Sequence, residues 1–209
     1  MDNMKIKQPK FTQELEKINI LSDNETEFSM IDTTEFENLK LKHYKLNECH
    51  FKNVSFLNCS FANVDCMDVI FENCDLSNID FSEGFLIRTI FKNCRLIGSD
   101  FTNARIQHTQ FINDKANYAN LSLSKCSNVV FDNSDFMETS FNETTFKDVT
   151  FDNCVLSKCE FLHTSLKDID ISSCEIGGML LSSDSLKGVI VSPLQAVELS
   201  KILGLKIRE

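Results

Sequence analysis

Residues 51–61 read Phe-Lys-Asn-Val-Ser-Phe-Leu-Asn-Cys-Ser-Phe, with a phenylalanine at every fifth position. The same frame runs without a break from Phe36 to Val191, and 25 of its 32 positions are Phe or Leu. A step of five residues turns a helical side chain by about 140°, and an odd spacing on a flat strand alternates between its two faces. The chain must therefore bend between one large apolar residue and the next.

Small or medium residues lie two positions before most of these large residues, as Val54, Cys59 and Val64 illustrate. Residues at i−2 and i share one face of an extended segment, so both can point into a common interior while the other three positions meet solvent. The second position after the large residue is often asparagine, which tolerates unusual backbone angles and forms local hydrogen bonds in turns. Each five-residue unit therefore predicts one side of a polygon with a turn at its corner.

The number of sides follows from sorting the frame at different multiples of five. At a step of twenty residues, one column holds phenylalanine at six successive places, from Phe51 to Phe151, and another holds both cysteines of the large position, Cys66 and Cys126. This sorting favours four sides for each coil. Coils would stack at the spacing of hydrogen-bonded strands, about 4.8 Å, so about eight coils make a rod of about 38 Å.

Units such as Cys74-Asp75-Leu76-Ser77-Asn78 and Ser134-Asp135-Phe136-Met137-Glu138 place a small residue and a polar residue before Leu or Phe, with two polar residues after it. In this pattern, about three quarters of the chain resembles the pentapeptide repeat proteins. The resemblance implies an all-β solenoid, namely a right-handed quadrilateral β-helix, with a handedness that the spacing alone does not give. A left-handed hexapeptide β-helix requires a period of six and is excluded.

The expected organisation is an N-terminal capping segment over residues 1–30, a β-helix over residues 31–192, and a C-terminal helix and tail over residues 193–209. Apolar residues spaced by three predict a short amphipathic helix over residues 11–21, which would cover the first coil as repeat proteins require. At the other end, Ser192 at the N-cap, Pro193 in the first turn and Gly204 after the last turn predict a helix over residues 194–203.

The C-terminal helix is too apolar to cover only the end of a thin rod. A two-fold homodimer through the C-termini would bury the surplus, and a simple monomeric cap is the alternative. The residues expected at the dimer interface are Leu194, Val197, Leu199, Ile202 and Leu203.

The nine cysteines all fall on inward positions of the frame. Because cysteine behaves as a small buried hydrophobe, we expect structural free thiols instead of a disulfide or zinc framework. The four histidines fall on separate outward positions, and the sequence has no glycine-rich phosphate loop. No catalytic residue, metal site or cofactor is therefore predicted, and the chain is not expected to be an enzyme.

No apolar run approaches the roughly 20 residues of a membrane span, and residues 1–5 lack the apolar core of a signal peptide. We therefore expect a cytoplasmic protein that makes no contact with a membrane.

The chain has a formal net charge of −10, and residues 31–192 contain 23 acidic and 14 basic residues. Carboxylates recur directly before the large residue on two adjacent sides of the rod. They are Glu35, Asp75, Asp135 and Glu175 on one side, and Asp80, Asp100 and Glu160 on the next. Carboxylates along a stiff narrow rod imitate the phosphate charge of a DNA duplex. Acidity that serves only solubility is the alternative.

An uninterrupted rod with the C-terminal sequence Gln195-Ala196-Val197-Glu198-Leu199 looks like the quinolone-resistance (Qnr) branch of the family. This resemblance implies a dimeric DNA mimic that binds DNA gyrase and topoisomerase IV, protects them from fluoroquinolones, and makes no direct contact with nucleic acid. Several Qnr proteins carry loops that bulge from the coils, and the irregular segment 114–123 is the place where one could do so here.

The alternative function is that of a cytosolic protein-interaction scaffold with an unidentified partner. Phe85, Ile87 and Ile90 are outward apolar residues in the frame and, together with Tyr118, form its candidate contact patch.

Overall fold

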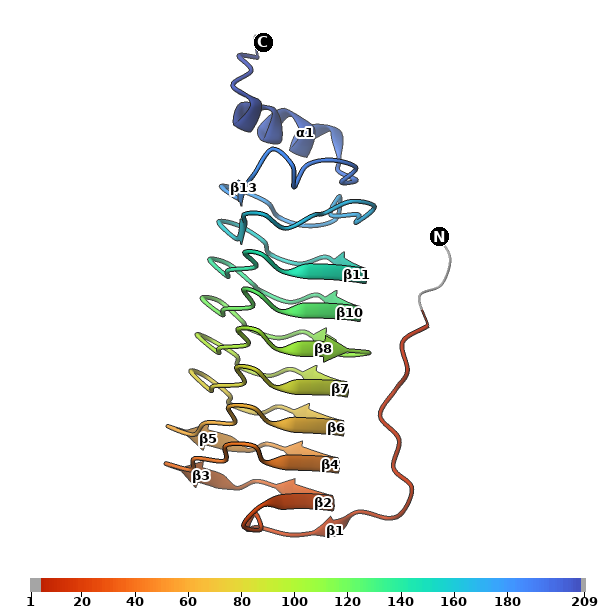
Figure 1. Ribbon diagram of the computed structural model, residues 1–209, viewed down its shortest axis with the longest axis vertical. Helices are drawn as coiled ribbons and strands as arrows, with labels where there is room; N and C mark the ends of the chain where they lie inside the picture. The colour runs from red at the N-terminus through yellow and green to blue at the C-terminus, as the bar shows by residue number, and fades with distance from the viewer. Residues whose placement is uncertain (1–4, 208–209) are drawn as a thin grey trace.

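The computed structural model describes residues 5–207, which form a β-solenoid of about eight coils with parallel stacked strands (Figure 1). The strands are β1 (Glu16–Lys17), β2 (Glu25–Asp32), β3 (Glu35–Glu37), β4 (Lys45–Lys52), β5 (Ser55–Leu57), β6 (Asp65–Glu72), β7 (Phe85–Lys92), β8 (Arg105–Gln107), β9 (Gln110–Ile112), β10 (Lys125–Asp132), β11 (Thr145–Asp152), β12 (Glu160–Phe161) and β13 (Leu180–Leu181). The helical elements are α1 (Pro193–Ser200) and the 3₁₀ turn η1 (Lys201–Leu203). The predicted β-helix of pentapeptide units is confirmed.

From β2 onward, strands pair at a constant offset of twenty residues, which is one coil. In the main sheet Phe71 pairs with Phe91, and on the other sides of the rod Asp80 pairs with Asp100. The predicted four sides per coil follow directly from this register. Residues 114–123 keep the same register, since Lys115 pairs with Asp135, so this segment does not bulge.

The core consists of ladders of identical side chains. The ring of Phe131 is fully buried and lies between Phe111 and Phe151, with centroid distances of 5.1 and 4.6 Å and interplanar angles of 16° and 10°. Phe136 meets the same ring edge-on at 5.1 Å. Stacked and edge-on contacts together fill the narrow interior, as the long phenylalanine column predicted, and all nine cysteines are free and buried.

Most corners of the coils contain a residue with positive φ. Among residues 5–207, twenty-eight non-glycine residues adopt such angles, between 47° and 63°, and twelve of them are asparagine. Asparagine tolerates this left-handed conformation better than other non-glycine residues. The predicted role of asparagine at the corners is therefore confirmed.

The N-terminal segment differs from the prediction in two ways. The coil register begins in β2, because Ser29 pairs with Cys49 in the regular offset, so residues 25–30 belong to the first coil instead of to the capping segment expected over residues 1–30. The predicted helix over residues 11–21 is wrong, because this stretch is extended and contains only β1. Its amide groups bond to the rod instead of to a helical turn, as when Ile18 N donates to Met30 O at 3.0 Å. Residues 5–15, which precede β1, run beside the rod (Figure 1).

The C-terminal helix begins as predicted. Ser192 caps α1, and the box is completed by Gln195, whose backbone N donates to Ser192 Oγ at 3.3 Å and whose Oε1 accepts from Ser192 N at 2.8 Å. Gly204 ends the 3₁₀ turn in the left-handed conformation, with φ of 74°. In the described part of the chain, neither helical element has the length and hydrophobicity that a membrane crossing demands.

Candidate interaction surface

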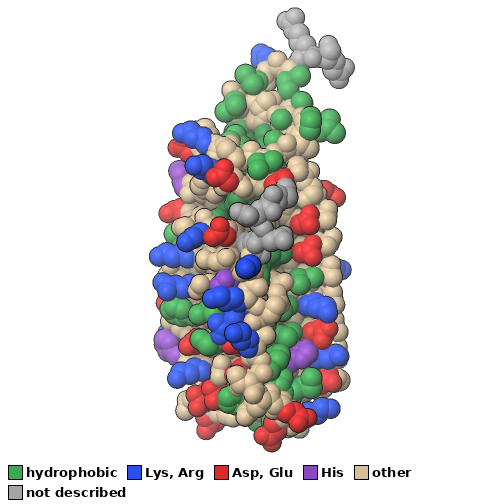
Figure 2. Space-filling view, turned by 90° about the vertical axis from the view of Figure 1, so that its right-hand side faces the viewer, with side chains coloured by type: hydrophobic (Ala, Val, Ile, Leu, Met, Phe, Trp, Pro, Cys, Tyr) green, Lys and Arg blue, Asp and Glu red, His purple; other side chains and the backbone are tan. Residues whose placement is uncertain are grey.

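Outward side chains form ladders along the rod, because equivalent residues of neighbouring coils lie about 4.8 Å apart. On the side shown in Figure 2, acidic and basic side chains mix over the coils, while hydrophobic side chains gather around the C-terminal end. The function of this surface therefore depends on the order of charges within each ladder, which composition alone does not describe.

The first acidic side is the ladder that runs from Glu35 to Glu175. Its members in order are Glu35, Ser55, Asp75, Arg95, Lys115, Asp135, Val155 and Glu175. The four predicted carboxylates do lie on this ladder, but two basic residues stand between them. The Nε atom of Arg95 lies 3.4 Å from Oδ2 of Asp75, and Lys115 pairs with Asp135 in the next coil. The middle of this side is therefore not acidic.

The second acidic side is the adjacent ladder, whose members are Lys40, Ser60, Asp80, Asp100, Asn120, Ser140, Glu160 and Leu180. From Asp80 to Glu160 this ladder contains no basic residue. Glu83 and Glu143 occupy the corner that follows it, both with φ of 56°, and both are exposed. Five carboxylates thus share one stretch of the surface, which makes this side the stronger anionic surface of the two.

Hydrogen bonds to the backbone orient four of the predicted carboxylates. In each case Oδ1 of the aspartate accepts from the amide two residues later: Ser77 N to Asp75 at 3.0 Å, Ser82 N to Asp80 at 2.9 Å, Thr102 N to Asp100 at 2.8 Å and Met137 N to Asp135 at 3.0 Å. Glu160 accepts from Asn142 Nδ2 at 2.7 Å. These carboxylates are therefore half-buried parts of the turns as well as surface charges, and a lysine in their place would remove a turn hydrogen bond.

The predicted contact patch is only partly assembled. Phe85 is 44% exposed and lies under Arg105, whose Cζ is 5.4 Å from the ring centroid, while Ile87 is half-buried on the same strand, β7. Ile90 follows on β7 beyond the next corner and is also half-buried. Tyr118 is exposed but belongs to the corner after the first acidic side, so it does not join this patch.

The C-terminal end is the most apolar exposed part of the molecule. Leu194, Val197, Ile202 and Leu203 are all exposed, with Leu194 at 84%. Leu199, which was predicted at a dimer interface, instead packs on the rod and is buried. Gln195 anchors the helix by donating from Nε2 to two backbone oxygens of the last coils at 2.9 and 2.8 Å.

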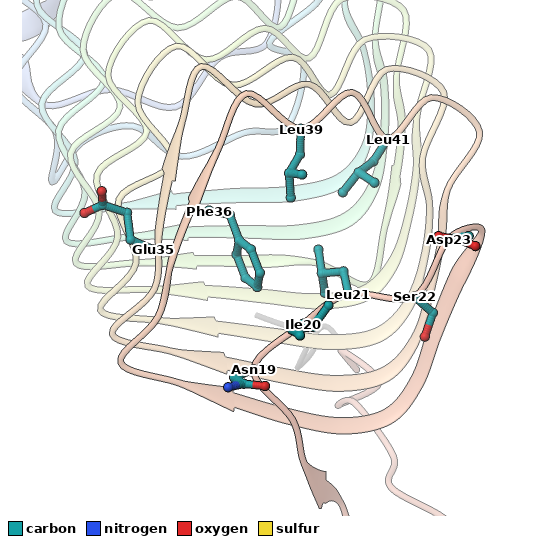
Figure 3. Close-up of a pocket in the computed structure, with 9 residues that line it drawn as sticks. All are labelled: Asn19, Ile20, Leu21, Ser22, Asp23, Glu35, Phe36, Leu39 and Leu41. Atoms are coloured by element: carbon teal, nitrogen blue, oxygen red, sulfur yellow. The ribbon is translucent and has the colours of Figure 1, made fainter.

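The N-terminal end of the rod is open. A hollow of about 370 Å³ lies there, and Figure 3 shows that Phe36, Leu39, Leu41 and Leu21 point into it while Glu35 points away. This hollow is the unfilled mouth of the solenoid core, and its lining provides no cluster of acid and base groups.

Sequence reasoning missed a buried carboxyl group. Asp114 occupies a small inward position between Cys94 and Ser134 of the neighbouring coils and is 2% exposed. Its Oδ1 accepts from Cys94 N at 2.7 Å, whereas its Oδ2 has no hydrogen-bond partner in the described part of the chain. Burial raises the pKa of Asp114 to about 8, so the carboxyl group is mostly protonated at neutral pH. The five-residue frame could have indicated this burial, because residue 114 lies two positions before residue 116, which occupies the place of the large inward residue.

Two sequence profiles match the chain. A profile of the pentapeptide repeat region matches residues 64–135, and a profile of eight pentapeptide repeats matches residues 45–82, 119–157 and 134–172. The chain belongs to the pentapeptide repeat proteins.

Solved structures of other pentapeptide repeat proteins have a similar fold. A trypsin-treated form of QnrB1, a plasmid-mediated fluoroquinolone resistance protein, is 24% identical with a TM-score of 0.50, over 94% of this chain and 100% of that one. HetL, which is involved in heterocyst differentiation regulation in the cyanobacterium Nostoc, is 16% identical with a TM-score of 0.50, over 78% and 89% of the two chains. None of the curated protein sequences matches significantly. At these identities the likeness establishes the fold.

Pentapeptide repeat solenoids are typically structural or interaction proteins. Among residues 5–207, no group of three or more His, Cys, Asp or Glu side chains is arranged to hold a metal ion. The candidate functional site of this pentapeptide repeat protein is accordingly an extended surface.

Proposed function

We propose that this pentapeptide repeat protein is a DNA mimic that binds DNA gyrase or topoisomerase IV, and that it protects these enzymes from fluoroquinolones or modulates them. The observation that carries the proposal is the second acidic side, where five carboxylates lie on neighbouring ladders with no basic residue from Asp80 to Glu160. The plasmid-mediated fluoroquinolone resistance of QnrB1, which shares the fold, supports the choice of target.

The charge density of this side is high enough to attract a DNA-binding surface but lower than that of DNA. Asp80 and Glu160 are four coils apart, or about 19 Å, so the five carboxylates give roughly one charge per 4 Å. A DNA duplex carries one charge per about 1.7 Å. The turn hydrogen bonds favour binding, because carboxylates that are already fixed lose little conformational entropy when a cationic groove closes on them.

We further propose that two copies join through their C-terminal ends. Leu194, Val197, Ile202 and Leu203 expose apolar side chains at this end, which a two-fold interface would remove from water. Such a dimer would double the length of the rod available to the target. A cytoplasmic location accords with this target.

The test is a supercoiling assay with purified gyrase, titrated with this protein in the presence and absence of ciprofloxacin. We expect the wild-type protein to inhibit supercoiling or to relieve drug-induced cleavage, and to do so less well as salt increases. The triple variant Asp80→Asn, Asp100→Asn, Glu160→Gln should lose this effect at the original concentration. Amides are chosen because they keep the turn hydrogen bonds and remove only the charge.

The matched control is Asp132→Asn, Asp152→Asn, Asp170→Asn, which removes three charges from another side of the rod. It should behave as wild type. If the control loses as much activity as the test variant, net charge alone governs the effect; if the test variant remains fully active, or wild type has no effect on gyrase, DNA mimicry is refuted.

A protein-interaction scaffold is the second candidate, and the exposed ring of Phe85 favours it. HetL shows that proteins of this fold also take part in developmental regulation. A scaffold that uses this patch would lose its partner on Ile87→Glu and would tolerate the amide substitutions of the acidic side.

A further inference from the structure

The N-terminal arm, residues 5–15, lies along one corner of the rod, on the side that faces the viewer in Figure 2. This corner, called the arm corner below, consists of Glu48, Asp68, Arg88 and His108 in four successive coils. The arm runs against the order of the coils. Its earlier residues contact the coil of His108, and its later residues contact the coil of Glu48.

Side chains of the arm corner bind the main chain of the arm. The amide N–H of Thr12 donates to the carboxylate of Glu48, and its hydroxyl Oγ1 lies 3.0 and 2.9 Å from the two carboxylate oxygens. The amide N–H of Lys10 donates to Oδ1 of Asp68 at 2.9 Å, and that of Lys7 faces Nδ1 of His108 at 3.5 Å. The corner thus recognises an extended backbone through three amide groups, which an extended peptide possesses, and through one hydroxyl.

The arm corner is one of several corners that lack asparagine in successive coils, as Leu123, Glu143 and His163 do elsewhere on the rod. Asparagine, the residue best suited to positive φ, is absent from four successive positions here, where φ lies between 51° and 59°, and returns at Asn128 in the coil beyond the described contacts. Glutamate and arginine are less favourable in this conformation. At these positions Glu48, Asp68 and His108 bond to the arm and Arg88 bonds to Asp68, so the corner supplies side-chain groups that fit an extended ligand.

The ion pair within the corner fixes the ligand-binding groups. Arg88 holds Asp68 with two hydrogen bonds, from Nε at 2.6 Å and from Nη2 at 2.5 Å. The carboxylates of Glu48 and Asp68 and the ring of His108 are all more than nine-tenths buried beneath the arm. Departure of the arm would expose two oriented carboxylates on a rigid edge.

The arm itself is held by few apolar contacts. Lys5, Lys7, Lys10 and Thr12 are exposed, and Phe11 is 38% exposed. Residues 5–12 contain three lysines and no acidic residue, so the rest of a chain with net charge −10 carries −13. Long-range attraction therefore favours a basic occupant, while the hydrogen bonds set its register.

We propose that the arm corner is a docking site for an extended, lysine-rich segment of a partner protein, and that residues 5–12 of this chain occupy the site until that segment displaces them. The arm corner is separate from the second acidic side, so this interaction does not depend on the proposed binding to gyrase.

The test uses full-length protein and a fluorescein-labelled peptide with the sequence of residues 5–15, followed by fluorescence anisotropy. In the variant Thr12→Pro the protein's own arm lacks both groups that bond to Glu48, and amide hydrogen exchange at Lys10 reports its release. We expect this variant to bind the peptide at least tenfold more tightly than wild type does. Adding Glu48→Ala should abolish binding, and raising the salt concentration should weaken it.

The matched control is Glu138→Ala in the Thr12→Pro background, because Glu138 is a corner carboxylate with φ of 59° on another side of the rod. It should leave peptide binding unchanged. A peptide with its three lysines replaced by glutamate should not bind. The proposal is overturned if the released corner binds neither peptide, if it binds both peptides equally, or if the variant instead doubles its mass in light scattering by exchanging arms between copies.

Discussion

Replacing Asp114 by Asn removes a carboxyl group from the core while keeping nearly the same shape. Oδ1 of either residue can accept the hydrogen bond from Cys94 N, which measures 2.7 Å. The backbone N–H of residue 114 donates to Ser134 Oγ at 2.9 Å, and the substitution leaves this hydrogen bond unchanged. The substitution therefore tests the charge of a single buried group against an otherwise unchanged interior.

The size of the effect follows from the pKa. Burial raises the pKa of Asp114 from an ordinary value of 3.8 to about 8. Between these values the folded protein binds a proton that the unfolded chain has released, so this group's contribution to stability is fully present below about pH 4 and is lost as the pH rises to about 8. One pKa unit corresponds to about 1.4 kcal/mol. Between pH 5 and pH 7, the free energy of unfolding of wild type should therefore fall by about 2 to 3 kcal/mol more than that of the variant.

Urea unfolding at pH 5, 6, 7 and 8 measures this difference. Other carboxylates also titrate, but subtracting the wild-type curve from that of Asp114→Asn isolates the buried group. Asp152→Asn, at an exposed position, is the matched control and should show a difference that does not change with pH. If Asp114→Asn and wild type lose stability in parallel from pH 5 to pH 8, the carboxyl group is not held protonated in the core and the reasoning fails.

Two further predictions test packing and assembly. Phe131→Ala should lower the free energy of unfolding by about 4 kcal/mol, because its buried ring is stacked on both sides at 5.1 and 4.6 Å. Phe85→Ala, on the surface, should lower it far less in the same urea melts. Equal losses would contradict the assignment of inward positions. Leu194→Glu combined with Leu203→Glu should halve the mass found by light scattering while leaving the helix cap intact, and an unchanged mass would exclude the C-terminal interface.

The fold was predictable because one short-range rule repeats along most of the chain. A large apolar residue such as Phe71 or Phe91 must face the interior, and the period of twenty then determines which side chains stack. The same rule accounts for the buried cysteines and for the asparagines at the corners. The cap of α1 was predictable for a similar reason, since Ser192 and Gln195 satisfy each other's backbone within a single turn.

The surface was only partly predictable, because the frame says which positions face outward but function depends on the order of charges along each ladder. Asp75 and Asp135 were correctly placed on one side, yet Arg95 and Lys115 lie between them and divide its charge. The turn hydrogen bonds of the aspartates were missed as well. An aspartate directly before the large residue can reach the amide two residues later, so sequence spacing could have indicated them.

The arm could not have been predicted by the rules that govern the rod. Strands β2 to β13 of the solenoid pair at the twenty-residue offset, whereas Lys7 meets His108 across 101 residues and Lys10 meets Asp68 across 58. No periodicity links such pairs. The spacing of apolar residues over 11–21 predicted a helix, because amphipathicity alone does not reveal that groups elsewhere in the chain will satisfy the amides of this stretch. Since the arm's position depends on a few polar contacts at one corner, and not on the repeating frame, substitutions at Glu48 or Asp68 can change what the corner binds without altering the fold. The solenoid therefore separates a stable scaffold, set by its inward residues, from binding specificity, set by residues that the scaffold does not constrain.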